Sequence, residues 1–417
     1  MHVRDVTVDL PDEASAARLA SVLQSVDGID VRSISDAAFR LHEGGKVEVR
    51  GRISVKNKED LSLVYTPAVA RFSSAIASDP AKAWALTARG NSVAIVSNGT
   101  AVLGLGDIGP LGALPVMEGK ALLFRDLAGI SAFPLVIGAR APREVIETCV
   151  HIAPSFGGIN LEDIAAPSCF EIERELRGRL DIPVFHDDQH GTAIVVLAGL
   201  RNAAAVVGMA MADMRVVVLG SGAAGIATAR LLKRAGAGQV ALVDRKGIVG
   251  PGRADLPPDK LAALRELGTT QDGSLAVAVA GAHAFIGLSG PNLLPLAVLR
   301  TMARPRIVFA MANPIPEIDP FIAGPECDIV ATGRSDHPNQ ANNVLAFPGV
   351  FRGLLDSGAR SVTDDVDLAA ADALAGVVTP DLRSAEYILP SPFDPHVVPA
   401  VAKAVAECAR RSGVTRT

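Results

Sequence analysis

The sequence lacks the patterns that mark several common classes of protein. Its four cysteines, in 417 residues, form no C-x-x-C pair, so neither a zinc ribbon nor a thiol redox motif is indicated. No apolar signal core follows the first methionine, and the longest apolar stretch, LAVAVAGAHAFIGL, is too short and interrupted to span a bilayer. A net charge of −5 implies no strongly basic surface for nucleic acid. We therefore expect a soluble cytoplasmic protein that binds neither nucleic acid nor a membrane.

The length of the chain suggests two or three domains. From about 192 to 349, the apolar segments RVVVLG, QVALVD, AFIGLS, RIVFAM and DIVATG alternate with alanine-rich helical stretches. This alternation is typical of a parallel, doubly wound sheet. We predict an α/β protein with a Rossmann-type domain at 191–384 and a mixed α/β substrate domain at 46–190. The C-terminal tail, 385–417, is expected to pack back on the substrate domain.

Residues 1–45 read as a separate small unit. VRDVTVDL alternates like a strand, DEASAARLASVLQSV has helical spacing, and IDVRSISDA is again strand-like. This strand–helix–strand pattern resembles a truncated ACT-type regulatory module. The alternative is a simple extension packed on the main body.

The pattern G-x-G-x-x-G occurs twice, as GLGDIG at 104–109 and GSGAAG at 220–225. Only the second is followed by a helix without breakers and then by a strand that ends in an acid, Asp244. After the first, prolines and glycines leave no room for a clean crossover helix, so we assign it to a turn of the substrate domain. The predicted dinucleotide-binding residues are Gly220, Ser221, Gly222, Ala223, Ala224, Gly225 and Asp244.

Two pairs of adjacent carboxylates stand out, Glu162 with Asp163 and Asp187 with Asp188. Clustered carboxylates without cysteines suit a hard cation such as Mg²⁺ or Mn²⁺. Adjacent side chains converge only at the end of a helix or strand, and INLEDI reads as such an end. Helix capping is the main alternative for the second pair. Two flanking histidines suggest zinc less well, because no third histidine is near.

Six motifs together resemble the malic enzyme family in its compact bacterial form. They are EDLSLVYTPAVA, TAVLGLGDIGPLGALPVMEGKALLF, INLEDI, FHDDQHGTAIVVLAG, ANPIPEI and ATGRSDHPNQANNVLAFPG. The resemblance runs from about Gly44 to the end of the chain. It implies oxidative decarboxylation of L-malate to pyruvate and CO2, with a nicotinamide nucleotide and a divalent metal as cofactors. It also implies a homodimer or a higher homo-oligomer.

Carried over motif by motif, the resemblance implies Tyr65 as general acid, Lys120 as general base and Asp187 as the acid that supports the base. A lysine acts as a base only if its pKa is lowered, for instance by burial beside the metal. The resemblance also implies metal ligands and residues that contact substrate or nicotinamide. These are Glu162, Asp163 and Asp188 for the metal, and Asn313 and Asn343 for substrate or nicotinamide.

The sequence departs from the family pattern at three places. Ala68 stands where glycine is usual, and His337 where tyrosine is common. The arginine that larger relatives carry ahead of the LGLGD loop is absent, with Thr100 and Ala101 in that region. Recognition of the substrate carboxylate must therefore come from elsewhere.

The acid at the end of the second Rossmann strand favours NAD, because Asp244 would accept hydrogen bonds from ribose hydroxyls and repel a 2′-phosphate. Arg245 and Lys246 follow it and could pair with a 2′-phosphate, so NADP is the alternative. Two other functions stay open. One is malolactic chemistry, which yields lactate, and the other is a catalytically silent dinucleotide sensor.

Overall fold

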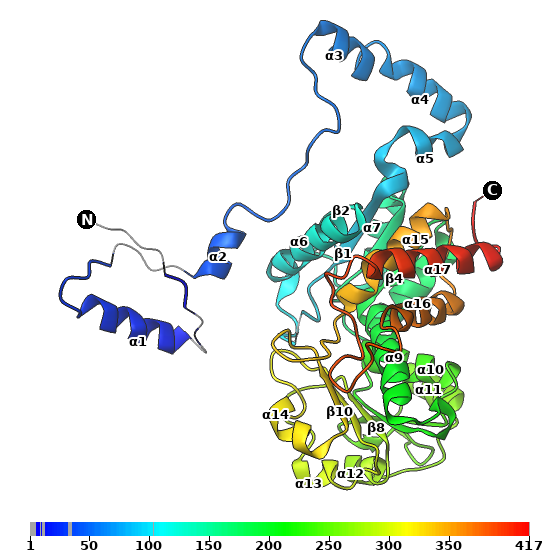
Figure 1. Cartoon of the computed structure of the whole chain (residues 1–417). Helices are drawn as coiled ribbons and strands as arrows, with labels where there is room; N and C mark the ends of the chain where they lie inside the picture. The colour runs from blue at the N-terminus through cyan, green and yellow to red at the C-terminus, as the bar shows by residue number, and fades with distance from the viewer. Residues whose placement is uncertain (1–5, 9, 11–12, 32–35, 103, 417) are drawn as a thin grey trace. The chain divides into compact units, whose positions relative to one another are not determined.

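The computed structural model describes residues 6–8, 10, 13–31, 36–102 and 104–416. The chain divides into two units, Met1–Arg52 and Ile53–Thr417, and each is considered by itself (Figure 1).

The N-terminal unit shows two helices among its described residues, α1 (Glu13–Gln24) and α2 (Ala37–His42). Helix α1 coincides with the predicted helix. The described parts of the two predicted strands, 6–8 with 10 and 29–31, are not extended strands, and the other residues of both patterns lie largely outside the described part. Asp36 instead caps α2, accepting a hydrogen bond from the backbone of Ala38. The ACT-like arrangement is therefore not shown.

Deletion of residues 1–45 is expected to leave a folded body with its metal activation unchanged. The reason is that both sheets and the acidic cluster described below lie wholly within Ile53–Thr417. Regulation or assembly is expected to change instead. Thermal melting and the Mn²⁺ dependence of activity check this, and loss of Mn²⁺ activation on deletion would contradict it.

The substrate domain is built on a four-stranded parallel sheet in the order β2-β1-β3-β4. Its strands are β1 (Ser92–Ser97), β2 (Ser131–Val136), β3 (Gly158–Leu161) and β4 (Val184–His186). The connecting helices are α6 (Gly109–Ala128), α7 (Pro142–Ile152) and α8 (Ser168–Arg179). This confirms an α/β architecture, and because the strands are parallel, the carboxyl ends of all four lie at one edge of the sheet.

Helix α6 corrects one prediction, because a complete helix does follow GLGDIG. Pro110 lies in its first turn, where a missing backbone N–H removes no helical hydrogen bond. Pro115 is interior and costs about 3 kcal/mol. Burial of Met117 and Phe124 on the same helix offsets that cost. The prediction was wrong because burial of the apolar face of α6 outweighs the effect of its prolines.

The predicted doubly wound sheet is confirmed in the second half of the chain, with the order β10-β9-β8-β5-β6-β7. The five predicted strands are all parallel, and the short antiparallel edge strand β7 was not predicted. The strands are β5 (Arg215–Leu219), β6 (Gln239–Asp244), β7 (Gly247–Ile248), β8 (Ala284–Gly287), β9 (Ile307–Ala310) and β10 (Ile329–Thr332). The helices around them are α10 (Ala223–Arg234), α11 (Pro258–Leu267), α12 (Leu275–Val279), α13 (Leu296–Leu299) and α14 (Pro320–Ala323).

Helix α9 (Asp187–Val207) joins the two sheet domains and lies between them in Figure 1. Among the described residues it is the one helix long and apolar enough to cross a membrane. However, 67% of its most apolar window is buried in the protein, as in the core helix of a soluble fold. Its residues belong to the same buried cluster as side chains from both sheets.

The C-terminal region consists of α15 (Phe347–Asp356), α16 (Asp364–Val377) and α17 (Val397–Arg411). Helix α17 packs against α15 and α16. Beyond it, the guanidinium of Arg416 stacks 3.8 Å from the ring centre of Trp84, ahead of β1. The tail thus contacts the substrate domain, while the predicted domain boundaries stay predictions.

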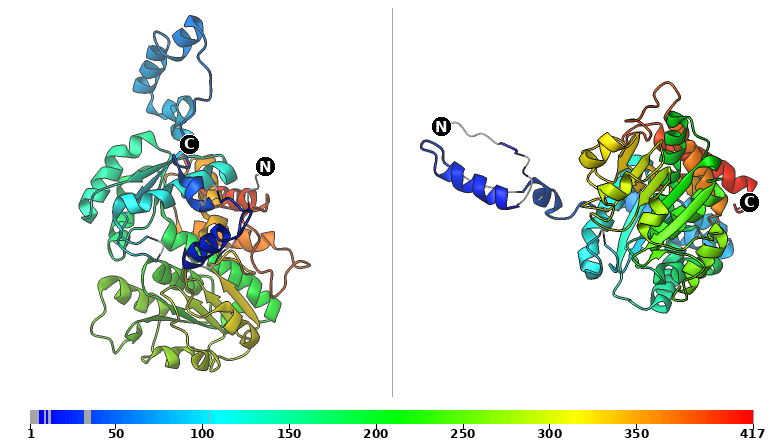
Figure 2. Two further views of the ribbon diagram at one scale, coloured as in Figure 1. Left: turned by 90° about the vertical axis from the view of Figure 1, so that its left-hand side faces the viewer. Right: turned by 90° about the horizontal axis from the view of Figure 1, so that it is seen from below.

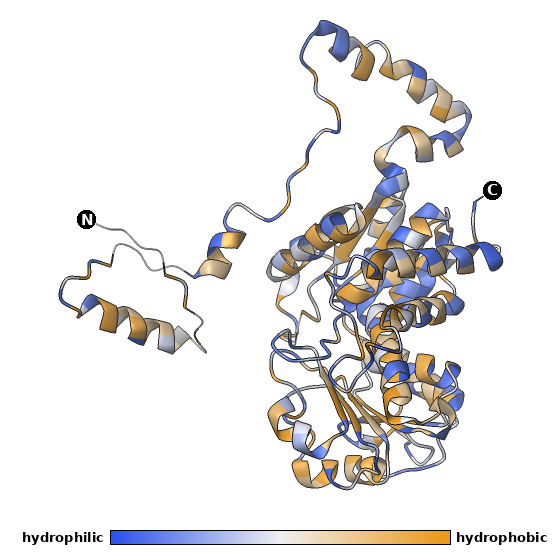
Figure 3. Cartoon of the chain, viewed as in Figure 1, coloured by the Kyte–Doolittle hydropathy of each residue, from blue (hydrophilic) through white to orange (hydrophobic). Residues whose placement is uncertain are grey.

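Helices α3 (Lys58–Val64), α4 (Val69–Ser78) and α5 (Ala83–Leu86) form an arm that projects from the body in Figures 1 and 2. None of the three helices buries a residue. The ribbon of the arm carries many hydrophobic positions (Figure 3). Leu63, Tyr65 and Phe72 are exposed large side chains on or next to α3 and α4. Trp84 fixes α5 to the body by packing on its core, but α3 and α4 bury no residue, and an amphipathic helix is stabilised mainly by packing of its apolar face.

Candidate active site

Both predicted carboxylate pairs lie at the carboxyl edge of the first sheet. Glu162 and Asp163 directly follow β3, and Asp187 and Asp188 open α9 directly after β4. Strands β3 and β4 are parallel neighbours, so their ends bring the two pairs together. The backbone N–H of Asp163 donates to Asp188 Oδ2 at 2.9 Å. The edge of a parallel sheet where strands end is the usual location of ligand sites in such folds.

Three of these carboxylates form a candidate metal site. One oxygen each of Glu162, Asp163 and Asp188 lies within 4.8 Å of the others. Glu162 and Asp163 are buried, whereas the Asp188 side chain is 32% exposed, which leaves the cluster open on one side. Burial raises the pKa of Glu162 to about 7 and that of Asp188 to about 6. Carboxylate oxygens are the donors that Mg²⁺ and Mn²⁺ prefer. A bound cation would also stabilise the charged forms of these carboxylates, which burial disfavours.

Lys120 reaches the cluster from α6. Its Nζ lies 2.6 Å from Glu162 Oε2 and donates to Asp187 Oδ2, and the side chain is only 6% exposed. Asn343 also donates from Nδ2 to Asp187 Oδ2. The structure thus brings together Lys120, Asp187 and Asn343, three residues far apart in the sequence.

The pKa of Lys120 is raised in this structure, whereas a general base is expected to have a lowered pKa. Burial alone would lower its pKa, but the carboxylates of Asp187 and Glu162 raise it above its usual range. Four carboxylates against one ammonium leave a formal charge of −3 at this edge of the sheet. A bound divalent cation would offset most of that charge and weaken the field that holds the proton on Lys120. A basic Lys120 therefore requires the metal.

The position of the Asp187 carboxylate explains why residue 191, at the end of the FHDDQHG motif, is a glycine. A Cβ at this position would lie 1.9 Å from Asp187 Oδ1, one turn earlier on α9, and 3.2 Å from the Cβ of Asn343. Any larger residue would push the Asp187 carboxylate out of its place between Lys120 and Asn343. The lack of a side chain at Gly191 therefore allows Asp187 to keep this orientation.

A buried ion-pair network supports the first turn of α9, and no local sequence pattern indicates its partners. His190 lies between two carboxylates, with Nδ1 at 2.7 Å from Asp367 on α16 and Nε2 at 3.0 Å from Glu173 on α8. Burial would lower its pKa, but Glu173 and Asp367 raise it to about 10. His186 is also buried, and burial lowers its pKa to about 4, so it is neutral. Both histidines have structural roles here.

The predicted dinucleotide loop has the geometry of a phosphate cradle. Residues 220–222 connect β5 to α10 and 223–225 begin α10, so the loop lies at the N-terminus of the helix. Gly220 has φ +119, and a Cβ at Gly225 would lie 1.7 Å from the Gly220 carbonyl oxygen, so only glycine fits this turn. Nothing lies within 4 Å of a Cβ at Gly222, which leaves open space for a pyrophosphate.

The GLGDIG loop of the first sheet domain contacts the loop after β9 of the second sheet domain. A Cβ on Gly104, in GLGDIG, would lie 2.4 Å from the carbonyl oxygen of Asn313, in the loop after β9. Glu317, which sequence reasoning missed, is fully buried and accepts hydrogen bonds from the backbone of Ser289 and Ala312. It thereby ties the loops after β8 and β9 together and fixes the segment that carries Asn313.

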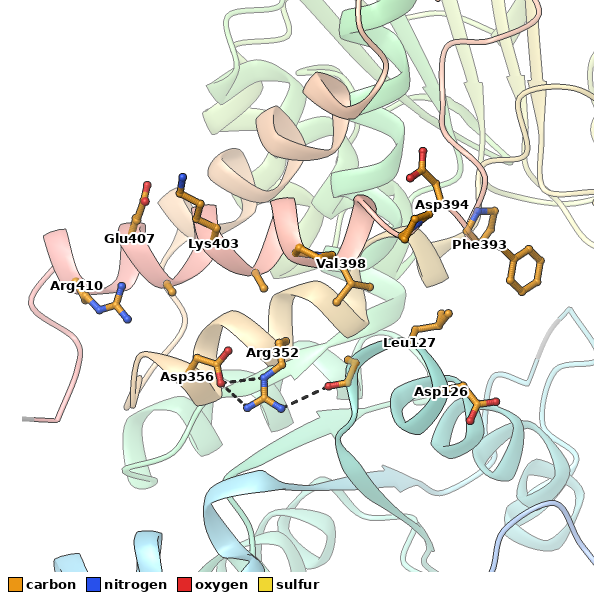
Figure 4. A pocket seen from close by; sticks show the side chains of 16 residues that line it. Asp126, Leu127, Arg352, Asp356, Phe393, Asp394, Val398, Lys403, Glu407 and Arg410 are labelled. Carbon is orange, nitrogen blue, oxygen red and sulfur yellow. Dashed lines mark hydrogen bonds and ion pairs between the residues drawn. The ribbon is translucent and has the colours of Figure 1, made fainter.

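Tyr65 is not part of this arrangement within the chain. It is the residue at the C-terminal end of α3, on the projecting arm, and it is 64% exposed. A separate cavity of about 730 Å³ lies between α6, α15 and α17 (Figure 4), with Leu127, Arg352 and Phe393 among its walls. It contains none of the predicted site residues.

The Rossmann-type sheet with its open glycine loop, next to a carboxylate cluster with a buried lysine, defines a metal-dependent dehydrogenase that uses a nicotinamide nucleotide. Two family models match the chain, "Malic enzyme, N-terminal domain" over 44–177 and "Malic enzyme, NAD binding domain" over 189–323 and 321–410. The chain belongs to the malic enzyme family. The second match covers GSGAAG and leaves GLGDIG to the other domain, as predicted.

Individual relatives agree with this assignment. The chain is 51% identical to an NAD-dependent malic enzyme of Geobacillus stearothermophilus, over 99% of this chain and 87% of the relative. It is 48% identical to a bifunctional malic/malolactic enzyme of Bacillus subtilis, over 92% of this chain and 95% of the relative. The structure of malic enzyme from Pyrococcus horikoshii superimposes with a TM-score of 0.87 at 46% identity, over 91% of each chain.

Proposed function

We propose that this protein oxidises L-malate and decarboxylates the product to pyruvate and CO2, with reduction of NAD. The observation that carries the proposal is the buried contact of Lys120 with Asp187 and Glu162, beside the Glu162–Asp163–Asp188 cluster. Two of the demands of the reaction are removal of the proton from the C2 hydroxyl and stabilisation of charge on that oxygen. This edge of the sheet has a lysine for the first and carboxylates that would hold a cation for the second.

The residues divide the reaction between them. Lys120 accepts the proton of the C2 hydroxyl, and Asp187, held by Asn343, keeps the amine aimed at it. The glycine loop would hold NAD, which would supply the hydride acceptor. Glu162, Asp163 and Asp188 would hold a divalent cation, which would supply Lewis acidity next to the substrate oxygens. Tyr65 protonates C3 of the enol. Asn313 contacts substrate or nicotinamide.

The exposed position of Tyr65 leads to a second part of the proposal, that the protein is a homo-oligomer. The part of the arm formed by α3 and α4 buries no residue of its own, yet carries apolar side chains. Packing on a second copy would cover it and would carry Tyr65 into that copy's site beside Lys120. The catalytic pair would then come from two chains. We also propose a cytoplasmic location, which the four free thiols fit.

Mixing two inactive variants tests the shared site. Tyr65→Phe and Lys120→Met are each expected to lose most activity, about 10²- to 10⁴-fold in kcat. A dissociated and reassociated one-to-one mixture is expected to regain about a quarter of wild-type activity, because half of the dimers are mixed and each holds one intact site. If Tyr65 acted within its own chain, no mixed dimer would hold an intact site and activity would not return.

The products distinguish oxidative decarboxylation from the two alternatives. With ¹³C-labelled L-malate, Mn²⁺ and NAD, NMR is expected to show pyruvate and bicarbonate. Lactate as the main product would show malolactic chemistry instead. Binding of NAD with no product at all would show a dinucleotide sensor, which has no need of a buried lysine beside four carboxylates.

A further inference from the structure

The acid predicted to read the adenosine ribose is already fully engaged by the protein. At the end of β6, Asp244 Oδ1 accepts from the backbone N–H of Lys246 at 2.8 Å and from Arg253 at 3.0 Å. Its Oδ2 accepts from Arg253 at 3.2 Å and from Lys260 Nζ at 2.6 Å. A carboxylate offers about four lone-pair sites, so these four hydrogen bonds use all of them.

This saturation changes what Asp244 does in cofactor choice. The expected role is to accept hydrogen bonds from the ribose hydroxyls, and that role needs a free acceptor site. No such site is left unless Arg253 or Lys260 moves away. Burial alone would raise the pKa of Asp244, but the hydrogen bonds from Arg253 and Lys260 lower it to about 2, so the carboxylate is charged and holds both cations firmly.

The two cations lie where a 2′-phosphate would need them. Arg253 lines a cavity of about 370 Å³ next to β7, together with Lys246 and Asp272. The side chains of Arg253 and Lys260 are 16% and 21% exposed, so both reach the surface beside Asp244. Lys246 is 69% exposed and pairs with Asp255 at 2.6 Å. Asp255 also accepts from Arg253, at 2.6 and 3.0 Å, so Arg253 is shared between two carboxylates, whereas Lys260 pairs with Asp244. In the Rossmann fold this strand end is where basic side chains accommodate the extra phosphate of NADP.

We propose that Arg253 and Lys260 set the cofactor choice, and that Asp244 favours NAD by sequestering these two cations rather than by accepting ribose hydrogen bonds. Held by Asp244, the pair is neutralised and unavailable to a 2′-phosphate. Released from it, Lys260 and the edge of the Arg253 guanidinium that faced Asp244 form a phosphate site, because an ammonium and a guanidinium donate in the geometry that a phosphate accepts, while Asp255 keeps the other edge of Arg253 in place. This inference rests on the proposed use of NAD and deepens it.

Displacement of NADH fluorescence from the full-length protein measures the effect without malate. The competitors are 2′,5′-ADP and, as the ligand without the 2′-phosphate, 5′-AMP. Asp244→Asn keeps the shape of the side chain and removes its charge. We expect it to bind 2′,5′-ADP about 10- to 100-fold more tightly than the wild type, as one or two released charged hydrogen bonds predict. Binding of 5′-AMP should change little.

The origin of the gain is tested by removing the cations. In Asp244→Asn/Arg253→Gln/Lys260→Gln the gain should disappear, whereas in Asp244→Asn/Lys246→Gln it should persist. If the gain survives loss of Arg253 and Lys260, Asp244 acts by direct repulsion of the phosphate, and the inference is wrong. If Asp244→Asn instead weakens 5′-AMP and gains nothing for 2′,5′-ADP, Asp244 does read the ribose, and the inference is wrong as well.

Two controls keep the outcome interpretable. Retained 5′-AMP binding and an unchanged melting temperature show that the triple variant is folded. Asp244→Asn/Lys260→Gln should lose part of the gain in 2′,5′-ADP binding that Asp244→Asn shows and leave 5′-AMP unaffected. A protein that binds NADH but does not turn over malate would fail the proposed function and still give a clear answer here.

Discussion

Lys120→Met is expected to lower kcat for malate oxidation by about 10²- to 10⁴-fold, the range for loss of a general base. Methionine keeps the length of the side chain and its packing on α6 but cannot accept the C2 hydroxyl proton. NADH binding should be unchanged, because the glycine loop between β5 and α10 lies in the other sheet domain. Steady-state kinetics at saturating Mn²⁺ and NAD measure the effect.

The matched control is Lys82→Met, which removes a half-exposed lysine that pairs only loosely with Asp79, at 3.6 Å. It should keep wild-type kcat. A fall in kcat for Lys120→Met that is accompanied by unfolding would be uninformative by itself, so near-ultraviolet circular dichroism is recorded on the same sample. A folded Lys120→Met enzyme with wild-type kcat would rule out Lys120 as the base.

Asp188→Asn is expected to raise the Mn²⁺ concentration needed for half-maximal activity by at least about 100-fold, since even residues that only orient metal ligands contribute 10- to 100-fold. Asparagine keeps an oxygen that can accept from the Asp163 backbone N–H, so the local fold should persist. What it removes is one of the three charges that face the cation. Activity titrated with Mn²⁺ measures the shift.

Asp126→Asn is the control for that variant, because Asp126 is an exposed carboxylate near the end of α6 that lines the separate cavity (Figure 4) and is not one of the three clustered carboxylates. Its Mn²⁺ titration should match the wild type, and NADH affinity should be the same in both variants. Unchanged Mn²⁺ activation in Asp188→Asn would show that the metal binds elsewhere and that Asp188 has only a local structural role.

The parts of the fold that could be predicted from sequence are those with a strong local signal. The buried strands β5, β6, β8, β9 and β10 are short apolar runs between helices, and GSGAAG sits between a strand and a helix. Adjacent carboxylates are expected to converge only at the end of a helix or strand, and INLEDI reads as such an end. In the structure the two pairs follow β3 and β4. Local pattern and tertiary context agree at these places.

Other features depend on contacts that no local pattern reveals. The buried ion-pair network around His190 joins side chains from α8, α9 and α16. The hydrogen bonds that occupy the Asp244 carboxylate come partly from a loop and a helix that follow it. Helix α6 forms despite Pro115 because its opposite face is buried. The two N-terminal strands stay predictions, since much of both patterns lies outside the described residues.

The central claim is that this site couples oxidation of malate to loss of CO2 with a divalent metal and NAD. The most direct test is absorbance at 340 nm with L-malate, Mn²⁺ and NAD, with pyruvate determined in the same sample. The account predicts NADH and pyruvate in equal amounts, both abolished by EDTA and restored by excess Mn²⁺. Malate consumption without net NADH, or NADH formation that EDTA does not affect, would contradict it.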